Sequence, residues 1–289
     1  MDERVALAFL AERLPSAGDD GAVVDGLVLT TDMLHERTDF PAGVTRYTAG
    51  WRAVGASLSD VAAMGAEAIA AVAAYGAPAF EPDELGAFVD GASEVCTLVG
   101  AEYVGGDLDA HGEFTAATTA LGRAQQPVRR SGARPGEAVC LTGVLGRTGA
   151  ALRLFERGDS ERANELFRFE PRVAAGRAVA SHAGSMMDVS DGLARSLHQL
   201  AAASDCGFAV ETPLPVHDGV REVAADEADA RELSVHLGED FELLFTVPED
   251  DLAAVHEASP VSVARIGTAV EEGVTLDGEA LADRGYTHG

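Results

Sequence analysis

Apolar strands and helices alternate along this chain in two stretches, and a segment rich in glycine, proline and arginine lies between them. That segment, "QQPVRRSGARPGE" at 125–137, has the composition of a linker. Alternation of strands with helices favours an α/β fold on each side of it. The sequence therefore predicts two α/β domains, which we divide as 1–127 and 128–289.

Hydrophobic periodicity places the elements within each domain. The clearest is a helix opened by Pro82 and closed by Gly100, since proline in the first turn and glycine after the last are typical helix ends. The expected strands are 27–31, 67–75, 101–107, 113–124, 138–143, 185–188, 207–211, 242–247 and 261–267. The expected helices are 2–14, 46–66, 81–100, 144–158 and 191–204, with two more between 158 and 185.

The balance of charge excludes several classes of partner. The chain carries 48 acids against 21 bases, a net charge of −27, so polyanions such as nucleic acid and anionic membranes are repelled. No apolar run approaches the ~20 residues that span a bilayer. The first residues form an acidic amphipathic pattern rather than a signal peptide. We therefore expect a cytoplasmic protein that binds neither nucleic acid nor membrane.

All 21 basic residues are arginine, and lysine is absent. This composition excludes a P-loop lysine, a Schiff-base lysine and the strand lysine of protein kinases. A strongly acidic chain favours adaptation to high salt, where the charged surface stays soluble and its self-repulsion is screened. Most of the 48 acids are then expected to solvate the surface rather than to do chemistry.

A smaller set of polar residues lies where an expected strand or a glycine turn ends, which is where a ligand is held rigidly. These residues are Asp19, Asp20, Thr30, Thr31, Asp32, Asp107, Asp188, Asp191, Glu239 and Asp240. Oxygen ligands without a histidine or cysteine cluster favour magnesium or calcium over zinc. Taken singly, Asp191 is better explained as a helix N-cap, and Asp20 as an Asx-turn residue.

Asp60 differs because it lies inside a helix, in "SLSDVAAMGA", that is otherwise apolar. We expect its carboxylate to be at least partly buried, and a buried carboxylate needs a partner. Lysine is absent and no arginine occurs between 53 and 122. The expected partner is therefore a cation from outside the chain.

The segment "TGVLGRTGAALRL" places Gly143, Gly146 and Gly149 between a strand and a helix. Backbone N–H groups at such a helix start would meet an anion. Close packing of the helix on the strand explains the same glycines equally well, so both interpretations stay open.

Together, seven blocks resemble the thiamine-monophosphate kinase family in order and spacing, from about residue 18 to residue 267. They are "GDDGAVV", "LTTDML", "SLSDVAAMGA", "GGD", "RSGARPGEAVCLTGVLG", "DVSDGLARSL" and "GEDFELLFT". The resemblance implies the two-domain α/β fold of the aminoimidazole ribonucleotide synthetase superfamily. Its N-terminal domain of sheet plus helices dimerises through the sheet, and ATP with several Mg²⁺ ions binds between this domain and the C-terminal α/β domain. The implied reaction is phosphorylation of thiamine monophosphate by ATP, which gives thiamine diphosphate and ADP.

Carried over position by position, the resemblance assigns roles to individual residues. The metal ligands would be Asp20, Thr30, Thr31, Asp32, Asp60, Asp107, Asp188 and Asp191, with Asp188 and Asp191 as the catalytic pair. ATP would contact Gly106, Asp107, Arg130 and Ser190, and the thiamine substrate would contact Asp39, Glu239 and Tyr286. No catalytic base is required, because a phosphate monoester with a second pKa near ~6 is already largely anionic at neutral pH. Catalysis then rests on positioning and charge neutralisation.

Three features depart from the family pattern. Asp39 stands where the family carries a histidine, with His35 nearby, and Leu108 and Asp109 follow "GGD" in place of two threonines. Tyr286 is the candidate for a C-terminal aromatic residue that the chain otherwise lacks. Two alternatives therefore stay open. One is another ATP-dependent enzyme of the superfamily, such as an aminoimidazole ribonucleotide synthetase, although its lysine-bearing motif is absent. The other is a non-catalytic acidic paralogue that binds cations or nucleotide.

Overall fold

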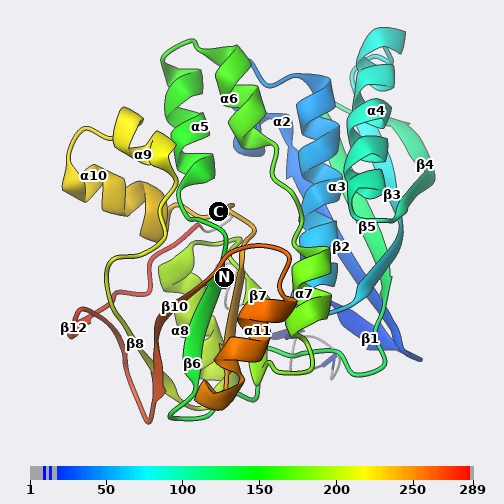
Figure 1. Cartoon of the computed structure of the whole chain (residues 1–289). Coiled ribbons are helices and arrows are strands. Elements are labelled where there is room, and N and C mark those ends of the chain that lie inside the picture. The colour runs from blue at the N-terminus through cyan, green and yellow to red at the C-terminus, as the bar shows by residue number, and fades with distance from the viewer. Residues whose placement is uncertain (1–8, 11–12, 15–17, 287–289) are drawn as a thin grey trace.

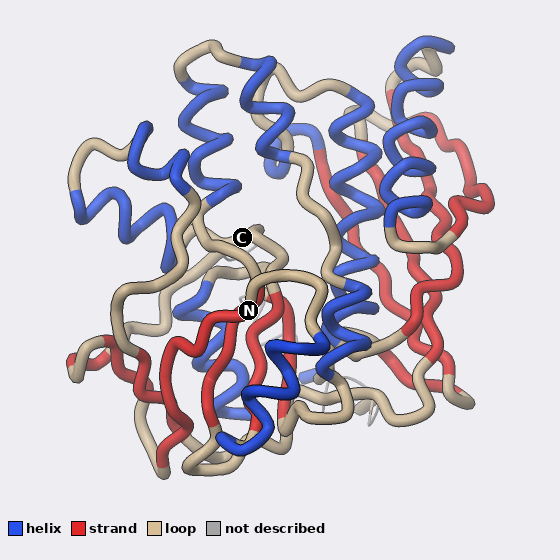
Figure 2. Tube along the Cα trace, in the orientation of Figure 1, coloured by secondary structure: helices blue, strands red, loops and turns tan. Residues whose placement is uncertain are grey.

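The structure, a computed structural model, describes residues 9–10, 13–14 and 18–286. The helix predicted over 2–14 therefore lies almost entirely outside the described residues. The described chain forms two β-sheets that stand side by side, with helices packed on and between them (Figure 1). Each sheet takes its strands from one half of the sequence (Figure 2), which confirms the two predicted α/β units. The exact point of division, between 127 and 128, stays a prediction.

The first sheet has five strands in the order β1-β2-β5-β3-β4. They are β1 (Ala22–Val24), β2 (Leu27–His35), β3 (Glu67–Ala77), β4 (Glu102–Ala110) and β5 (Thr115–Arg123). Two helices, α3 (Arg46–Ala63) and α4 (Pro82–Leu98), cover one face of this sheet (Figure 1), and the short α2 (Glu36–Asp39) follows β2. Strand positions alternate between the two faces, so β2 turns Val28, Thr30 and Asp32 towards α3 and Leu29 and Met33 away from it.

Helix α3 is buried along most of its length because it lies between the first sheet, α4 and the second domain. It approaches α4 closely through glycines. A side chain at Gly50 would collide with the backbone of Phe88, and one at Gly91 with the backbone of Tyr47. The helix ends at Ala63, earlier than the predicted residue 66, because Gly65 adopts a left-handed φ of 63°.

The second sheet has seven strands in the order β12-β11-β8-β10-β6-β9-β7. They are β6 (Ala138–Thr142), β7 (Ser185–Asp188), β8 (Gly207–Val210), β9 (Leu243–Val247), β10 (Val263–Val270), β11 (Val274–Leu276) and β12 (Glu279–Ala280). The α-helices of this half are α5 (Arg147–Glu156), α6 (Ser160–Phe167), α7 (Val173–Val179), α8 (Leu193–Ser204), α9 (Asp218–Val223), α10 (Glu227–Arg231) and α11 (Leu252–Ala258). A π-helical turn, Glu232–His236, and a 3-10 turn, Glu249–Asp251, complete it.

One hydrophobic core joins the two halves. Val28 and Leu58 from the first unit belong to the same buried cluster as Met186 and Phe245 from the second. The contacts run through α3, which packs on both α7 and β7. Side chains of α3 are therefore held rigidly against the second domain. Among the described residues, no helix is long and apolar enough to cross a membrane.

Candidate active site

Three acids that are distant in sequence meet where the two domains touch. Asp20 comes from the loop before β1, Asp60 from the last turns of α3, and Asp188 from the end of β7. One carboxylate oxygen of each lies within 4.8 Å of the others. We call Asp20, Asp60 and Asp188 the carboxylate cluster. Asp20 and Asp188 are buried, with 8% and 1% of their surface exposed, so like charges are brought together away from water.

Hydroxyl groups hold two of these carboxylates in place. Ser59 Oγ donates to Asp188 Oδ2 at 2.6 Å, and Thr30 Oγ1 donates to Asp60 Oδ2. Asp188 Oδ1 is buried and has no hydrogen-bond partner among the described residues. A buried carboxylate oxygen without a partner, beside two other carboxylates, has the chemistry of a cation ligand. The all-oxygen donor set fits Mg²⁺.

The protonation of the cluster reflects this crowding. Burial, followed by the charges of Asp32, Asp188 and Asp20, raises the pKa of Asp60 well above its usual range. Burial and the charge of Asp20 raise the pKa of Asp188 to about 7, although Ser59, Ser190 and Arg130 act in the opposite direction. Asp60 and Asp188 therefore hold protons more tightly than ordinary carboxyl groups, and a divalent cation would displace those protons.

Arg130 supplies the positive charge at the edge of the cluster. Its Nε and Nη2 donate to Asp20 Oδ2 and Oδ1 at 3.1 and 2.8 Å. Burial, the largest single effect, lowers the pKa of Arg130, but the charge and hydrogen bond of Asp20 together with the charges of Asp188 and Asp60 raise it overall, so the guanidinium stays charged. Arg129 points elsewhere, because its half-exposed side chain pairs with Asp19 at 2.5 Å. Of these two neighbours, Arg130 alone reaches the carboxylate cluster.

The "LTTD" segment contributes through alternate residues. Thr30 bonds to Asp60, and Asp32 Oδ2 accepts a hydrogen bond from Ser57 Oγ of α3 at 2.9 Å. Thr31 faces the other side of the sheet, where its hydroxyl donates to Thr118 O at 2.9 Å. The hydroxyl of Thr31 was expected in the metal site and does not lie there, because neighbouring strand residues point to opposite faces.

Asp107 and Gly106 also lie apart from the cluster. Asp107 is on the edge strand β4, and its register through β3 and β5 aligns it with Met33, on the face opposite α3. Strands lie about 4.8 Å apart, so β4 is roughly 14 Å from β2 across the sheet. Within one chain, Asp107 therefore does not share an ion with Asp60, contrary to the expected ligand set. Beside Gly106 and Asp107 lies a pocket of about 450 Å³, lined in part by Tyr75, Phe88 and Tyr103.

Two of the residues expected at the thiamine end meet each other. Tyr286 Oη donates to Asp39 Oδ1 at 3.2 Å, and Tyr286 N donates to Asp191 O at 3.1 Å. Tyr286 in the C-terminal segment thus contacts both Asp191 and Asp39. Asp39 is buried and stands where the family pattern has a histidine. Asp191 is not a helix cap, because the N-cap of α8 is Gly192 and no side chain caps it. The side chain of Asp191 accepts a hydrogen bond from Gln199 at 3.2 Å.

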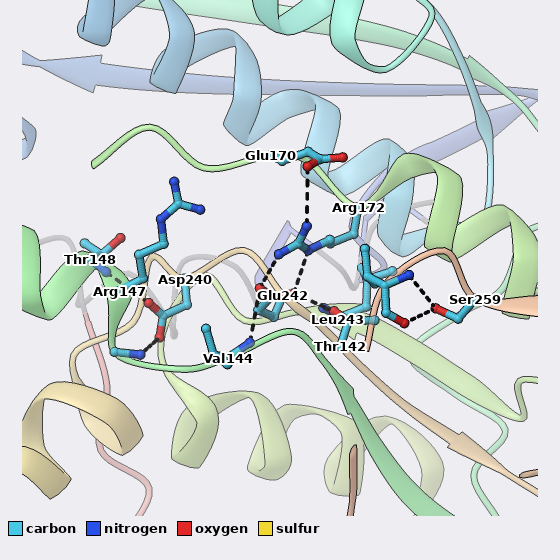
Figure 3. A network of polar contacts seen from close by, with 12 residues as sticks. Thr142, Val144, Arg147, Thr148, Glu170, Arg172, Asp240, Glu242, Leu243 and Ser259 are labelled. Atoms are coloured by element: carbon cyan, nitrogen blue, oxygen red, sulfur yellow. Dashed lines mark hydrogen bonds and ion pairs between the residues drawn. The ribbon is translucent and has the colours of Figure 1, made fainter. Parts of the chain in front are cut away.

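The "GEDFE" loop holds three acids in separate contacts. Asp240 accepts from the backbone N–H groups of Gly146 and Thr148 at 2.6 and 3.2 Å, so the anion at the start of α5 is an acid of the chain itself (Figure 3). Glu242 accepts two hydrogen bonds from Arg172 at 2.7 and 2.6 Å. Glu239, the expected substrate contact, forms an ion pair with Arg52 at 2.8 Å.

The glycines before α5 serve packing. A side chain at Gly143 would collide with the carboxylate of Glu242, and one at Gly149 with the backbone of Leu233. Gly146 has a φ of 82°, which explains why α5 begins at Arg147 rather than at the predicted residue 144. Of the two interpretations of this motif, close packing is the one that the structure supports.

Arg52 is a buried charged residue of this region that was not predicted from the sequence. It lies in α3, eight residues before Asp60, and only 2% of it is exposed. Like Asp60, Arg52 is a charged residue within an apolar helix, and this feature is visible in the sequence. Because that helix also faces the second domain, the partner of Arg52 comes from a segment 187 residues away.

Comparison with known proteins agrees with this architecture. Residues 18–124 match the family model "AIR synthase related protein, N-terminal domain", and residues 134–278 match "AIR synthase related protein, C-terminal domain". The thiamine-monophosphate kinase of Halobacterium salinarum is 62% identical over 291 residues, and the alignment covers 100% of both chains. The thiamine-monophosphate kinase of Methanospirillum hungatei is 41% identical over 304 residues, covering 100% of this chain and 99% of the relative.

A solved structure described as AaThiL complexed with AMPPCP and TMP superimposes with a TM-score of 0.90 at 26% identity, covering 99% of this chain and 97% of the other. The Thermus thermophilus protein tt0281 superimposes with a TM-score of 0.87 at 32% identity, covering 97% of this chain and 98% of the other. These matches confirm the predicted two-domain fold and the predicted family. The chain belongs to the thiamine-monophosphate kinase family, within the AIR synthase related proteins.

Proposed function

We propose that this chain transfers the γ-phosphoryl group of ATP to thiamine monophosphate and releases thiamine diphosphate and ADP. One observation of the structure carries the proposal: a buried carboxylate cluster with an unpartnered oxygen lies beside a fixed guanidinium, where the two domains meet. Membership of the thiamine-monophosphate kinase family is the basis for naming phosphoryl transfer as the reaction. The relative from Halobacterium salinarum, 62% identical over the full chain, is itself a thiamine-monophosphate kinase.

Magnesium is the cofactor that this donor set fits best. The candidate ligands are Asp20, Thr30, Asp32, Asp60, Asp188 and Asp191, which offer oxygen atoms alone. Bound divalent cations neutralise the charge of the phosphates and so lower the repulsion between two polyanionic substrates.

The residues of the chain have separate tasks in this reaction. The carboxylate cluster and its hydroxyl partners fix where the phosphates lie, and Arg130 adds a permanent positive charge there. Ser190 lies close enough to Asp188 to lower the pKa of that carboxyl group, and this proximity supports Ser190 as a contact of the nucleotide. No side chain needs to remove a proton, because the acceptor phosphate is already anionic.

A second copy of the chain completes the site in this proposal. The face of the first sheet opposite α3 exposes Val24, Leu29 and Met33, with exposed fractions of 59%, 47% and 55%. An apolar sheet face of this kind is stable when it is covered. A homodimer through it would bring Gly106 and Asp107 of one copy towards the carboxylate cluster of the other. The 450 Å³ pocket beside these residues is then the candidate site for the base of ATP.

The test is a coupled assay of ADP release in molar salt, because the composition favours high-salt conditions. Thiamine monophosphate is expected to stimulate ADP release, and aminoimidazole ribonucleotide precursors are not. ATP alone gives the background. Stimulation by the aminoimidazole precursor alone would favour the sister enzyme, and nucleotide binding without turnover would favour the non-catalytic paralogue.

Arg130→Ala is expected to raise the KM for ATP by about tenfold to a hundredfold, because a charge-assisted contact to phosphate is lost. Arg129→Ala is the matched control. It removes a neighbouring guanidinium that pairs with Asp19 and does not reach the cluster, so its KM for ATP should stay within about twofold of wild type. Steady-state kinetics at varied ATP decide the matter. A larger effect from Arg129→Ala would assign the nucleotide to the opposite side of the loop.

Glu239→Gln is expected to raise the KM for thiamine monophosphate by roughly tenfold to a hundredfold, since a hydrogen bond to a charged group contributes about 1.5–3 kcal/mol. The KM for ATP should not change, because Glu239 lies outside the carboxylate cluster. Glu170→Gln, an exposed acid near the same loop, is the control and should alter neither constant. Equal losses of affinity for both substrates would remove Glu239 from the thiamine end.

A further inference from the structure

Arg52 is a buried guanidinium that the proposed reaction does not use directly. Its Nη1 donates to Phe167 O at 2.7 Å, and its Nη2 donates to Glu239 Oε2 at 2.8 Å. The guanidinium stacks on the ring of Phe167, 3.7 Å from its centroid. The rings of Phe169 and Phe241, stacked on each other at 4.1 Å, lie about 5.5 and 5.4 Å from it. Arg52 is therefore fixed by aromatic rings as well as by hydrogen bonds.

The backbone of Glu239 is held equally firmly. Its N–H donates to Ser190 O at 2.6 Å, and its carbonyl oxygen accepts from Thr148 Oγ1 at 2.6 Å. Glu239 adopts a φ of 57°, a left-handed conformation that a residue with a side chain takes only when its surroundings impose it. Main chain and side chain are thus both constrained, and the residue is linked directly to the loop that carries Ser190.

The two oxygens of the Glu239 carboxylate have different surroundings. Oε2 is bound by Arg52, whereas Oε1 accepts no hydrogen bond from the residues that the structure describes. The side chain is 23% exposed, so one oxygen is available to a ligand. The adjacent guanidinium balances the charge of the carboxylate. The Oε1 atom of Glu239 is therefore a hydrogen-bond acceptor in a fixed orientation, and the arginine–glutamate pair to which it belongs has little net charge.

We propose that Arg52 is a positioning residue for substrate recognition. It fixes the Glu239 carboxylate and balances its charge. The site then selects an amine on the substrate ring by hydrogen-bond geometry rather than by the positive charge of the substrate. This inference rests on the proposed function, in which Glu239 contacts the aminopyrimidine of thiamine monophosphate. The group that the site selects is an exocyclic amine, which donates a hydrogen bond. An exocyclic oxygen at the same ring carbon cannot donate one and is selected against.

Recognition of this kind suits a protein whose net charge of −27 favours concentrated salt. The Debye length falls to about 3 Å at 1 M salt, so attraction between an exposed carboxylate and a cationic ring is largely screened. A direct hydrogen bond to an oxygen held in place depends much less on ionic strength. With Arg52 paired to Glu239, substrate binding therefore depends on a hydrogen bond that tolerates salt rather than on a charge attraction that salt screens.

The experiment compares thiamine monophosphate with its 4-oxo analogue, in which oxygen replaces the amine. In the wild-type enzyme, kcat/KM should favour the amine by about tenfold or more, and the KM for thiamine monophosphate should change less than about threefold between 0.5 and 3 M KCl. Equal use of both compounds by an enzyme that phosphorylates thiamine monophosphate would overturn the inference and leave the proposed function intact. Absence of turnover with thiamine monophosphate would instead overturn the proposed function.

Variants then assign the effect to Arg52. Arg52→Lys keeps the charge but cannot hold Phe167 O and Glu239 in the same planar arrangement. Its KM for thiamine monophosphate should rise about tenfold and its preference for the amine should fall, while its KM for ATP stays within about twofold. Arg172→Lys is the control, because it disturbs another buried arginine–glutamate pair on the same loop and should lower only the melting temperature.

A double variant keeps the test decisive if Arg52→Lys folds poorly. Arg52→Met with Glu239→Gln removes both charges, so no unpaired charge is left buried. It should retain the wild-type far-UV circular dichroism but lose the preference for the amine. Retention of that preference, or parallel rises in the KM for ATP and for thiamine monophosphate, would show that Arg52 only joins the two domains.

Discussion

Replacement of Asp60 by asparagine is expected to lower kcat by roughly a thousandfold or more while the far-UV circular dichroism stays that of the wild type. Asp60 contributes a carboxylate oxygen within 4.8 Å of those of Asp20 and Asp188. An amide in its place is a poorer cation ligand and carries no charge to balance one. Asp90→Asn, on the exposed side of α4, is the control and should be fully active. Near-normal turnover in Asp60→Asn would remove it from the metal site.

The same variant should be more stable than the wild type when metal is removed. The folded-state pKa values of Asp60 and Asp188 are raised, so the unfolded state releases their protons first as pH rises. Metal-free stability therefore falls from about pH 4, the usual carboxylate range, through about pH 7, where Asp188 ionises in the folded state. The amide introduced by Asp60→Asn carries no charge and lessens this repulsion. In EDTA at pH 8 the melting temperature of the variant should exceed that of the wild type, and added Mg²⁺ should raise it less. A lower melting temperature in EDTA would indicate that Asp60 has a stabilising structural role.

The parts of the site that could be predicted from the sequence are those with a local signal. Asp60 stands out inside an apolar helix, and Asp188 stands out after an apolar strand. Because α3 is buried between two domains, a charged residue in this helix requires a partner of opposite charge or a hydrogen-bonding group. Such positions indicate candidate ligands, but the strand-end rule alone also selected Thr31 and Asp107, whose side chains lie away from the cluster.

Partners across long separations had no such signal. Nothing in the sequence places Arg52 beside Glu239, or Asp240 at the start of α5, because those contacts depend on how α3 crosses the second domain. The order of strands was equally hidden. The sequence placed both Asp32 and Asp107 at the ends of strands, but both lie inside longer strands, β2 and β4. Strand β4 lies at the edge of the sheet, with Asp107 on the outer face. Local patterns predict the elements, and only the packing of those elements decides which acids meet.

The position of Asp107 leads to the second large effect. If a partner copy supplies Asp107 to the carboxylate cluster, Asp107→Ala and Asp60→Asn inactivate different halves of one site. Each variant alone should be inactive. In a mixed dimer, the cluster of the Asp107→Ala chain is intact and receives Asp107 from the Asp60→Asn chain, so one of the two sites is complete.

Mixing the two inactive variants, with exchange of subunits, should therefore restore activity. Random pairing makes half of the dimers mixed, and each mixed dimer has one working site of two, so about a quarter of wild-type activity is expected. Asp60→Asn mixed with Asp188→Asn is the matched control. Both residues lie in the same cluster of one chain, so every mixed dimer has two damaged sites and should stay inactive. Recovery in the control, or none in the Asp60 and Asp107 mixture after mixed dimers have been demonstrated by size and mass, would place Asp107 outside the shared site.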